Sequence, residues 1–298
     1  MFWHTTRFRI DLSSPKVMGI VNVTPDSFSD GGSHADAQSA LVHCEQLLKE
    51  GADILDIGGE SSRPGAPTLS VEEEWARVGP VLQGALSLGV PISVDTCKTQ
   101  VMQRALDLGV DIINDIRALQ APGAESVVVA HGQCGVCLMH MQGDPSTMQF
   151  RPQYSDVIDE VRTFLQERVQ AMVAQSVARD RLCLDPGIGF GKTPQHNLDL
   201  LRRQSELLSF GLPLLVGWSR KSTLGHVTGR PVGDRLAASL AAALASVHQG
   251  AKVVRVHDVA ATVDALKVWS ASEIPPNSWP MAVHSAPQSI TLLTSNRP

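Results

Sequence analysis

The sequence predicts a (β/α)8 barrel, and three observations support this fold class. Eight short apolar segments of strand length recur along the 298 residues, and stretches of helical periodicity separate several of them. The segments are almost wholly apolar, as parallel strands are when helices cover both faces of a sheet. Eight such units within about 250 residues match this barrel. A doubly wound open sheet is the main alternative, because it shows the same alternation.

The expected strands, in chain order, are rich in Val, Ile and Leu. They span residues 16–22, 53–58, 91–95, 111–116, 135–140, 182–186, 213–217 and 253–257. Long helices are expected at residues 35–50, 71–88, 154–176 and 233–249, and a reduced helix in "APGAESVVVAHG".

Local signals support the helix boundaries. Ser70 followed by Glu73 has the pattern of a capping box at the start of the second helix. Glycines precede several strands, as expected where a helix ends in a left-handed residue: Gly51, Gly89, Gly109, Gly211 and Gly250. We therefore expect residues 1–270 to form a single barrel domain. Residues 271–298 are rich in Ser and Pro and have no period, so they are expected to be disordered or draped over the surface.

Composition narrows the class of protein. A hydrophobic content of 43% and a charged content of 18% are those of a globular domain. The net charge of -5 argues against a nucleic-acid binder, which normally carries a basic face. No apolar run approaches the roughly 20 residues that span a bilayer, and the N-terminus lacks the pattern of a secretory signal. Five irregularly spaced cysteines fit a reducing compartment, so a cytoplasmic location is expected.

Polar side chains gather at the carboxyl ends of the predicted strands, where a barrel of this kind builds its active site. Asp95, Asn114 and Asp185 each end an apolar strand. Burial of such groups is unfavourable unless they are hydrogen-bonded, so together they favour a ligand rich in donors. Taken one at a time, each can also be a helix cap or a turn residue.

A second group of residues at the strand ends is basic. Arg255 and His257 are two positions apart on one strand, so they project to the same face and form a candidate anion site. The alternative is a solvated strand end or an interface pair. With Arg63, Arg220 and Lys221 they would create a local positive field suited to phosphate and carboxylate groups.

Two other motifs lead to weaker interpretations. "LDPGIGFGKT" resembles a phosphate-binding loop, but Pro186 stands where that loop requires its first glycine. "HGQCGVCLMH" offers His131, Cys134, Cys137 and His140 as zinc ligands. Cys137 and His140 fall within a predicted buried strand, which favours packed core thiols instead.

Eight ordered motifs identify a resemblance to a known family. They are "MGIVNVTPDSFSDGG", "DIGGESSRPGA", "SVDTCK", "INDI", "LMHMQGDPSTMQ", "LDPGIGFGKT", "LLVGWSRKS" and "VVRVHDV". In order and spacing, from residue 17 to residue 269, the chain resembles the dihydropteroate synthases, the folate-pathway enzymes that sulfonamide drugs target. The resemblance implies a barrel that joins hydroxymethyl-dihydropterin diphosphate to para-aminobenzoate and releases diphosphate.

The resemblance also implies roles for individual residues. A pterin pocket corresponds to Asp95, Asn114, Ile116, Met139, Asp185, Gly217 and Lys221. A diphosphate pocket corresponds to Asn22, Ser62, Arg255 and His257, with Mg2+ engaging the diphosphate and the Asn22 loop. The loops "NVTPDSFSDGG" and "ESSRPGA" would close over the diphosphate and complete a para-aminobenzoate pocket lined by Phe28, Ser62, Arg63, Pro64, Phe190, Lys221 and Ser222. Following the family, diphosphate would leave first and the aniline nitrogen would attack the resulting cation.

The same resemblance implies partners and alternatives. Sulfonamides would be inhibitors, and a homodimer would form through the helices near the end of the chain. The family usually has Ser-Thr-Arg-Pro-Gly where this chain has "SSRPG", so Ser62 keeps the hydroxyl and lacks a methyl group. One alternative is a pterin-binding module like those of corrinoid methyltransferases, and another is an inactive paralogue. The arginine-bearing second loop and the "SRKS" loop favour the synthase.

Overall fold

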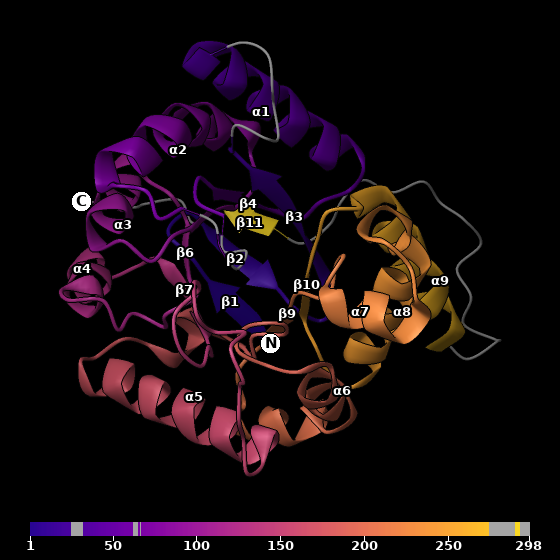
Figure 1. The fold of residues 1–298 in the computed structure, drawn as a ribbon. Helices are drawn as coiled ribbons and strands as arrows, with labels where there is room; N and C mark the ends of the chain where they lie inside the picture. Colours follow the sequence, from indigo (N-terminus) through magenta and orange to yellow (C-terminus); the bar gives the residue numbers. More distant parts are fainter. Residues whose placement is uncertain (25–31, 62–64, 66, 274–289, 293–298) are drawn as a thin grey trace.

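Eight parallel strands form a closed barrel in the computed structural model (Figure 1). The model describes residues 1–24, 32–61, 65, 67–273 and 290–292. The strands pair in the order β8-β7-β6-β5-β4-β3-β10-β9, and a parallel bridge between Leu184 and Leu214 joins β8 to the segment before β9. The barrel strands are β3 (Lys16–Asn22), β4 (Ile54–Gly58), β5 (Ile92–Asp95), β6 (Ile112–Asp115), β7 (Gly135–Met139), β8 (Leu182–Asp185), β9 (Leu215–Val216) and β10 (Val253–Val256). The predicted barrel is therefore confirmed, and the open sheet is not formed.

Helices connect the strands and surround the barrel (Figure 1). They are α1 (Gly32–Lys49), α2 (Val71–Ala85), α3 (Thr99–Leu108), α4 (Ala124–His131), α5 (Val157–Ala174), α6 (Pro194–Arg202), α7 (Ser222–Thr228), α8 (Leu236–His248) and α9 (Val259–Glu273). Short 3-10 turns are η2 (Leu86–Leu88), η3 (Arg179–Arg181), η4 (Gln204–Phe210) and η5 (Val232–Asp234). The helix signals are confirmed as well, since Ser70 and Glu73 form the capping box and the five predicted glycines have φ values between 64° and 98°.

An N-terminal hairpin covers the amino end of the barrel. Strands β1 (Phe2–His4) and β2 (Phe8–Asp11) pair antiparallel, and β11 (Ile290–Leu292), from the predicted tail, adds to β2. The indole of Trp3 donates a hydrogen bond to the carbonyl of Arg181 at 2.9 Å. The Arg7 guanidinium pairs with the fully buried carboxylate of Asp111, at 2.6 Å for the closest contact. The sequence analysis did not predict this hairpin, and it fixes which end of the barrel is open to ligands.

Two apolar cores follow from this arrangement. The larger core lies between the strands and the surrounding helices. The smaller fills the lower barrel interior, where hairpin side chains meet the first inward residue of most strands: Trp3, Phe8, Ile10, Leu12, Met18, Ile54, Ile112, Cys137, Cys183, Leu215 and Val253. Because side chains alternate along a strand, residues two and four positions beyond these also face inward, toward the open end.

Candidate active site

This alternation gathers the predicted polar residues at one mouth. Five of the predicted site residues lie an even number of positions after an inward core residue of their own strand, so their side-chain positions also face inward. They are Asn22, Asn114, Met139, Asp185 and Gly217. The same holds for Arg255 and His257, which follow Val253 by two and four positions. The barrel interior thus changes from apolar at the hairpin end to charged at the carboxyl ends of the strands.

Arg255 is the centre of a network that ties four strands together, β10, β4, β5 and β6. Its Nε donates to Oδ2 of Asp56 and its Nη2 to Oδ2 of Asp95, each at 2.6 Å. The side-chain amide of Asn114 donates to the same oxygen of Asp56 at 3.1 Å. Burial raises the pKa of Asp95, and the adjacent Arg255 opposes this rise. The network therefore fixes the positions of Asp95, Asn114 and Arg255 relative to one another.

Asp56 is a site residue that sequence reasoning missed. Its side chain is fully buried, and Oδ1 has no hydrogen-bond partner among the described residues. An unpaired carboxylate oxygen beneath the mouth is unfavourable in the free protein. Its position in the strand is the sequence signal that could have identified it. Asp56 is two residues after Ile54 in an otherwise apolar strand, so both side chains face the barrel interior.

Asp185 and Lys221 lie on the opposite side of the barrel from Asp56. Oδ1 of Asp185 accepts a hydrogen bond from the amide of Gly187 at 2.7 Å, and burial raises the pKa of this carboxyl to about 6. Lys221 directly precedes α7. Burial and the charge of Arg255 lower the pKa of Lys221 to about 8, while the carboxylates of Asp185 and Asp95 act in the opposite direction. The two groups thus offer an acceptor and a donor to the same ligand.

Apolar surface lies beside these groups. Met139 is buried at the end of β7, and half-buried Ile116 directly follows β6. The turn after Ile116 contains two non-glycine residues in left-handed conformation, Ala118 and Leu119, with φ values of 50° and 61°. Such a turn is strained, so it must be held by its surroundings.

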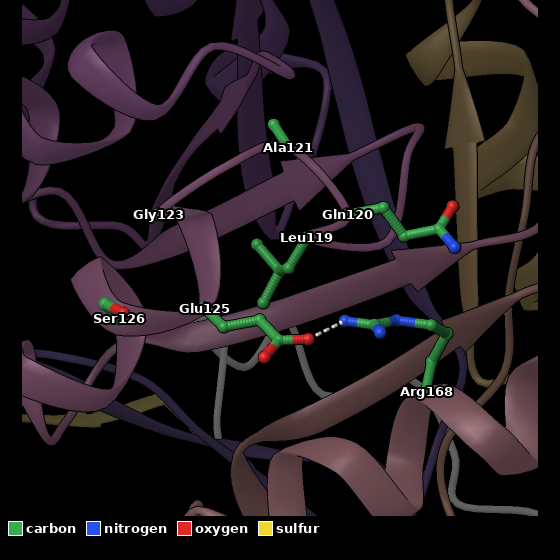
Figure 2. A pocket seen from close by; sticks show the side chains of 7 residues that line it. All are labelled: Leu119, Gln120, Ala121, Gly123, Glu125, Ser126 and Arg168. Atoms are coloured by element: carbon green, nitrogen blue, oxygen red, sulfur yellow. Dashed lines mark hydrogen bonds and ion pairs between the residues drawn. The ribbon is translucent and has the colours of Figure 1, made fainter.

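A brace from α5 holds this turn. Figure 2 shows Arg168 of this helix reaching toward Glu125 beside Leu119. Arg168 donates from Nε to the carbonyl of Ala118 at 2.8 Å and forms an ion pair with Glu125. The carboxylate of Asp115 accepts from the amide of Leu119 at 2.7 Å. A hollow of about 400 Å³ beside this ion pair is lined by Gln120, Ser126 and neighbouring residues, and it lies outside the barrel mouth. The brace therefore supports the position of Ile116.

The predicted anion residues lie at the rim. His257 follows β10, its backbone amide donates to Oγ of Ser219 at 3.1 Å, and its Nδ1 lies 3.0 Å from the same oxygen. Burial, together with the charges of Arg220 and Arg255, lowers the pKa of His257 to about 4, so the ring is neutral at pH 7. Asn22 is half-buried at the end of β3. The rim thus offers hydrogen-bonding groups beside the charge of Arg255.

Residues of the predicted aminobenzoate pocket divide into two groups. Phe190 follows β8, and its ring centroid lies 4.2 Å from Nζ of Lys221. Ser222 is exposed at the first position of α7. Phe28, Ser62, Arg63 and Pro64 lie outside the described residues.

The alternative zinc ligands point to different surroundings. Cys137 packs in the barrel interior with Cys183, while the thiol of Cys134 accepts from Arg181 at 3.4 Å. Nδ1 of His140 lies 2.9 Å from Nζ of Lys192. Among the residues that the structure describes, no cluster of three or more His, Cys, Asp or Glu side chains could hold a metal ion. Within the same residues, no helix is both long enough and apolar enough to cross a bilayer.

Known proteins share this architecture. A family described as pterin binding enzyme matches residues 18–257. Dihydropteroate synthase of Neisseria meningitidis serogroup B is 57% identical over 275 residues, which cover 90% of this chain and 96% of that protein. The Yersinia pestis dihydropteroate synthase in a sulfonamide drug complex is 47% identical with a TM-score of 0.86, over 92% of this chain and 99% of that one. The Xanthomonas albilineans enzyme in complex with 7,8-dihydropteroate is 45% identical with a TM-score of 0.82, over 91% of this chain and 100% of that one.

Proposed function

This chain belongs to the pterin-binding enzymes and, within them, to the dihydropteroate synthases, and we propose that its barrel mouth orders the two substrates of that reaction by depth. The reaction joins 6-hydroxymethyl-7,8-dihydropterin diphosphate to para-aminobenzoate and releases diphosphate. The observation that carries the proposal is the Arg255 network, in which the carboxylates of Asp56 and Asp95 and the amide of Asn114 lie together, with the guanidinium between them and the side of the mouth that carries His257.

The pterin lies on the floor. Its flat ring carries adjacent N–H donors that suit the carboxylates of Asp185 and Asp95, while the amide of Asn114 and the ammonium of Lys221 serve its ring nitrogens and carbonyl. Met139 and Ile116 pack against the ring faces, and Gly217 leaves room at the wall. A buried carboxylate that accepts two donors from one ligand gives both affinity and orientation.

The diphosphate lies at the rim. Nη1 of Arg255 makes no hydrogen bond to the part of the chain that the structure describes, and it can bind an anion without releasing Asp56 or Asp95. His257 and Asn22 flank it, and Ser62 completes the pocket from the second loop. This arrangement places the positive charge where negative charge develops when the diphosphate departs.

Mg2+ fits this site only together with the diphosphate. Asn22 supplies one hard oxygen ligand, and Mg2+ in proteins commonly takes one or two side-chain oxygens and completes its shell with phosphate oxygens and waters. When bound, the ion would neutralise charge on the diphosphate. Calorimetry should therefore detect weak or no Mg2+ binding to the protein alone and clear binding with the pterin diphosphate present.

The chemistry proceeds without a covalent bond to the protein. The carbon–oxygen bond of the substrate breaks, and the electron pair leaves with the diphosphate. The methylene cation is stabilised by the electron-rich pterin and by the carboxylates of Asp95 and Asp185. The aniline nitrogen of para-aminobenzoate then forms the new carbon–nitrogen bond, and its proton passes to the released diphosphate or to water. Catalysis comes from positioning and from fixed charge.

Para-aminobenzoate lies above the pterin, against Phe190, Lys221 and Ser222, and Phe28, Ser62, Arg63 and Pro64 enclose it from the two loops. The ring of Phe190 offers an apolar wall, and the cation of Lys221 next to it suits a benzoate. Sulfonamides, which share the aniline ring, would compete at this pocket. A coupled assay should detect formation of the joined product, with one diphosphate released per product, only when both substrates are supplied. No product with folded protein and both substrates would contradict the proposal.

We also propose a homodimer through α7, η5 and α8 and activity in the cytoplasm. Val227, Val232 and Leu236 are large apolar residues with 59%, 55% and 42% exposure on consecutive elements. Neighbouring exposed apolar side chains are typical of a protein–protein interface. All five cysteines are free thiols, as expected in a reducing compartment. Light scattering measures the oligomeric state directly.

A further inference from the structure

Lys192, in the motif "GFGKT", is a buried cation that the reaction leaves without a role. Its exposure is 2%, and its ammonium faces two loops. The carbonyl oxygens of Gly187 and Phe190 each lie 3.0 Å from Nζ, Nδ1 of His140 lies at 2.9 Å, and the carbonyl of His140 lies at 3.3 Å. Instead of holding phosphate, this lysine is surrounded by acceptors from the protein itself.

The contacts define the direction of each hydrogen bond. A charged lysine has three N–H donors and no acceptor. Burial lowers the pKa of Lys192 to about 7. When Lys192 is charged, Nδ1 of His140 accepts from it, which leaves the ring proton on Nε2. Burial and the adjacent charge of Lys192 lower the pKa of His140 to about 2, so the ring stays neutral. The three donors match the three nearest acceptors, with two on the loop after β8 and one on the segment after β7.

These two loops approach so closely that a side chain does not fit at either of two glycines. A Cβ atom on Gly187 would lie 1.8 Å from the carbonyl oxygen of His140, and one on Gly191 would lie 2.4 Å from that of Gln142. Carbonyl oxygens that converge in a buried space repel each other unless a donor satisfies them. Lys192 supplies that donor and joins the loop of Phe190 to the segment that follows Met139.

We infer that Lys192 is a positioning residue for para-aminobenzoate. It holds the backbone of Phe190 in the place from which the Phe190 ring forms a wall of the aminobenzoate pocket. This inference rests on the proposed function, in which Phe190 lines that pocket. The loop has other ties, since Asn197 accepts from the amide of Gly189 at 2.9 Å and Gln149 donates to its carbonyl at 2.6 Å. Phe190 itself is held on both sides of its backbone: its amide donates to the carbonyl of Gly187 at 3.1 Å, and its carbonyl accepts from Lys192 at 3.0 Å. Lys192 contacts both of these carbonyls, so it fixes the turn that carries the Phe190 ring.

The test is a double-mutant cycle on the intact enzyme with Lys192→Met and Phe190→Ala. Lys192→Met should raise the KM for para-aminobenzoate at least about tenfold, because small displacements of a positioning group have large effects. The dissociation constant of the pterin diphosphate should change less than about threefold. In the Phe190→Ala background the effect of Lys192→Met should largely disappear, since residues that act through one another are not additive. Lys267→Met, on the exposed face of α9, is the matched control.

The outcomes separate the inference from the proposed function. If Phe190→Ala leaves the KM for para-aminobenzoate unchanged, the proposed pocket is wrong. If Phe190→Ala raises it and Lys192→Met does not, or if the two effects simply add, Lys192 does not act through Phe190. If Lys192→Met does not fold, His140→Asn tests the same tie from the other loop without removing a charge. It should raise the same KM by a smaller factor, and an unchanged value would overturn the inference.

Discussion

Replacing Asp185 with asparagine should make the unliganded protein more stable and the enzyme inactive. Asp185 is 7% exposed, and burial raises its pKa from 3.8 to about 6. At about 1.4 kcal/mol for each pH unit, this rise corresponds to about 3 kcal/mol of lost stability at pH values above 6. Asparagine keeps Oδ1 as an acceptor for the amide of Gly187 and removes the buried charge. Its amide group would face the pterin donors, which should weaken pterin binding about 100-fold or more.

The sign of the pH dependence makes this prediction specific. The folded-state pKa lies above the unfolded value, so the folded state binds the proton more tightly between about pH 4 and pH 6. The free energy of unfolding therefore falls as pH rises through this range, and the loss is complete above pH 6. Urea denaturation should find Asp185→Asn more stable than the parent at pH 8 and nearly equal to it at pH 4. Equal stability at both pH values, or calorimetric pterin affinity like that of the parent, would refute the reasoning.

Three further predictions concern the hairpin, the rim and the exposed face of α8. Arg7→Met should lower the free energy of unfolding, measured by urea denaturation, by about 3 kcal/mol or more, because it leaves buried Asp111 without its counter-ion. The control is Arg104→Met, which removes an exposed ion pair and should change the free energy of unfolding by less than about 1 kcal/mol. Diphosphate binding near pH 6 should take up a proton at His257, whose pKa of about 4 must rise beside an anion. Calorimetry in buffers of different ionisation enthalpy measures this uptake, and an undiminished value in His257→Gln would argue against it. Leu236→Asp should give a monomer by light scattering, and a dimer that persists would exclude this face as the interface.

Sequence patterns predicted the barrel because each strand is a local apolar run with a local end signal. The eight strands lie within two residues of their expected bounds, since burial on both faces selects the residues of each strand independently. The hairpin has no such signal. Its strands are short, with three residues in β1 and four in β2. The hairpin is held in place by hydrogen bonds from Trp3 to Arg181 and from Arg7 to Asp111, which are more than 100 residues away in the sequence. Contacts of this kind arise from the closed barrel and cannot be read from a short window.

The site was predicted where polar residues end strands and missed where they lie within one. Asp95, Asn114 and Asp185 were found because each is one of the last two residues of its strand. Asp56 lies between Leu55 and Ile57, so a search of strand ends did not find it. Lys192 was set aside when the phosphate-loop interpretation failed, because its acceptors are backbone carbonyls and the sequence does not encode where carbonyls converge.

The charge balance around Arg255 explains why the hidden residue Asp56 matters. Asp56 and Asp95 share the guanidinium of Arg255, so this part of the free site holds more buried acid than base, and this excess is unfavourable without a ligand. A neutral pterin relieves part of it through hydrogen bonds. A cationic methylene carbon relieves more, because it adds the positive charge that the site lacks. The carboxylates therefore stabilise the state that follows loss of diphosphate more than they stabilise bound substrate, which is the difference that accelerates a reaction.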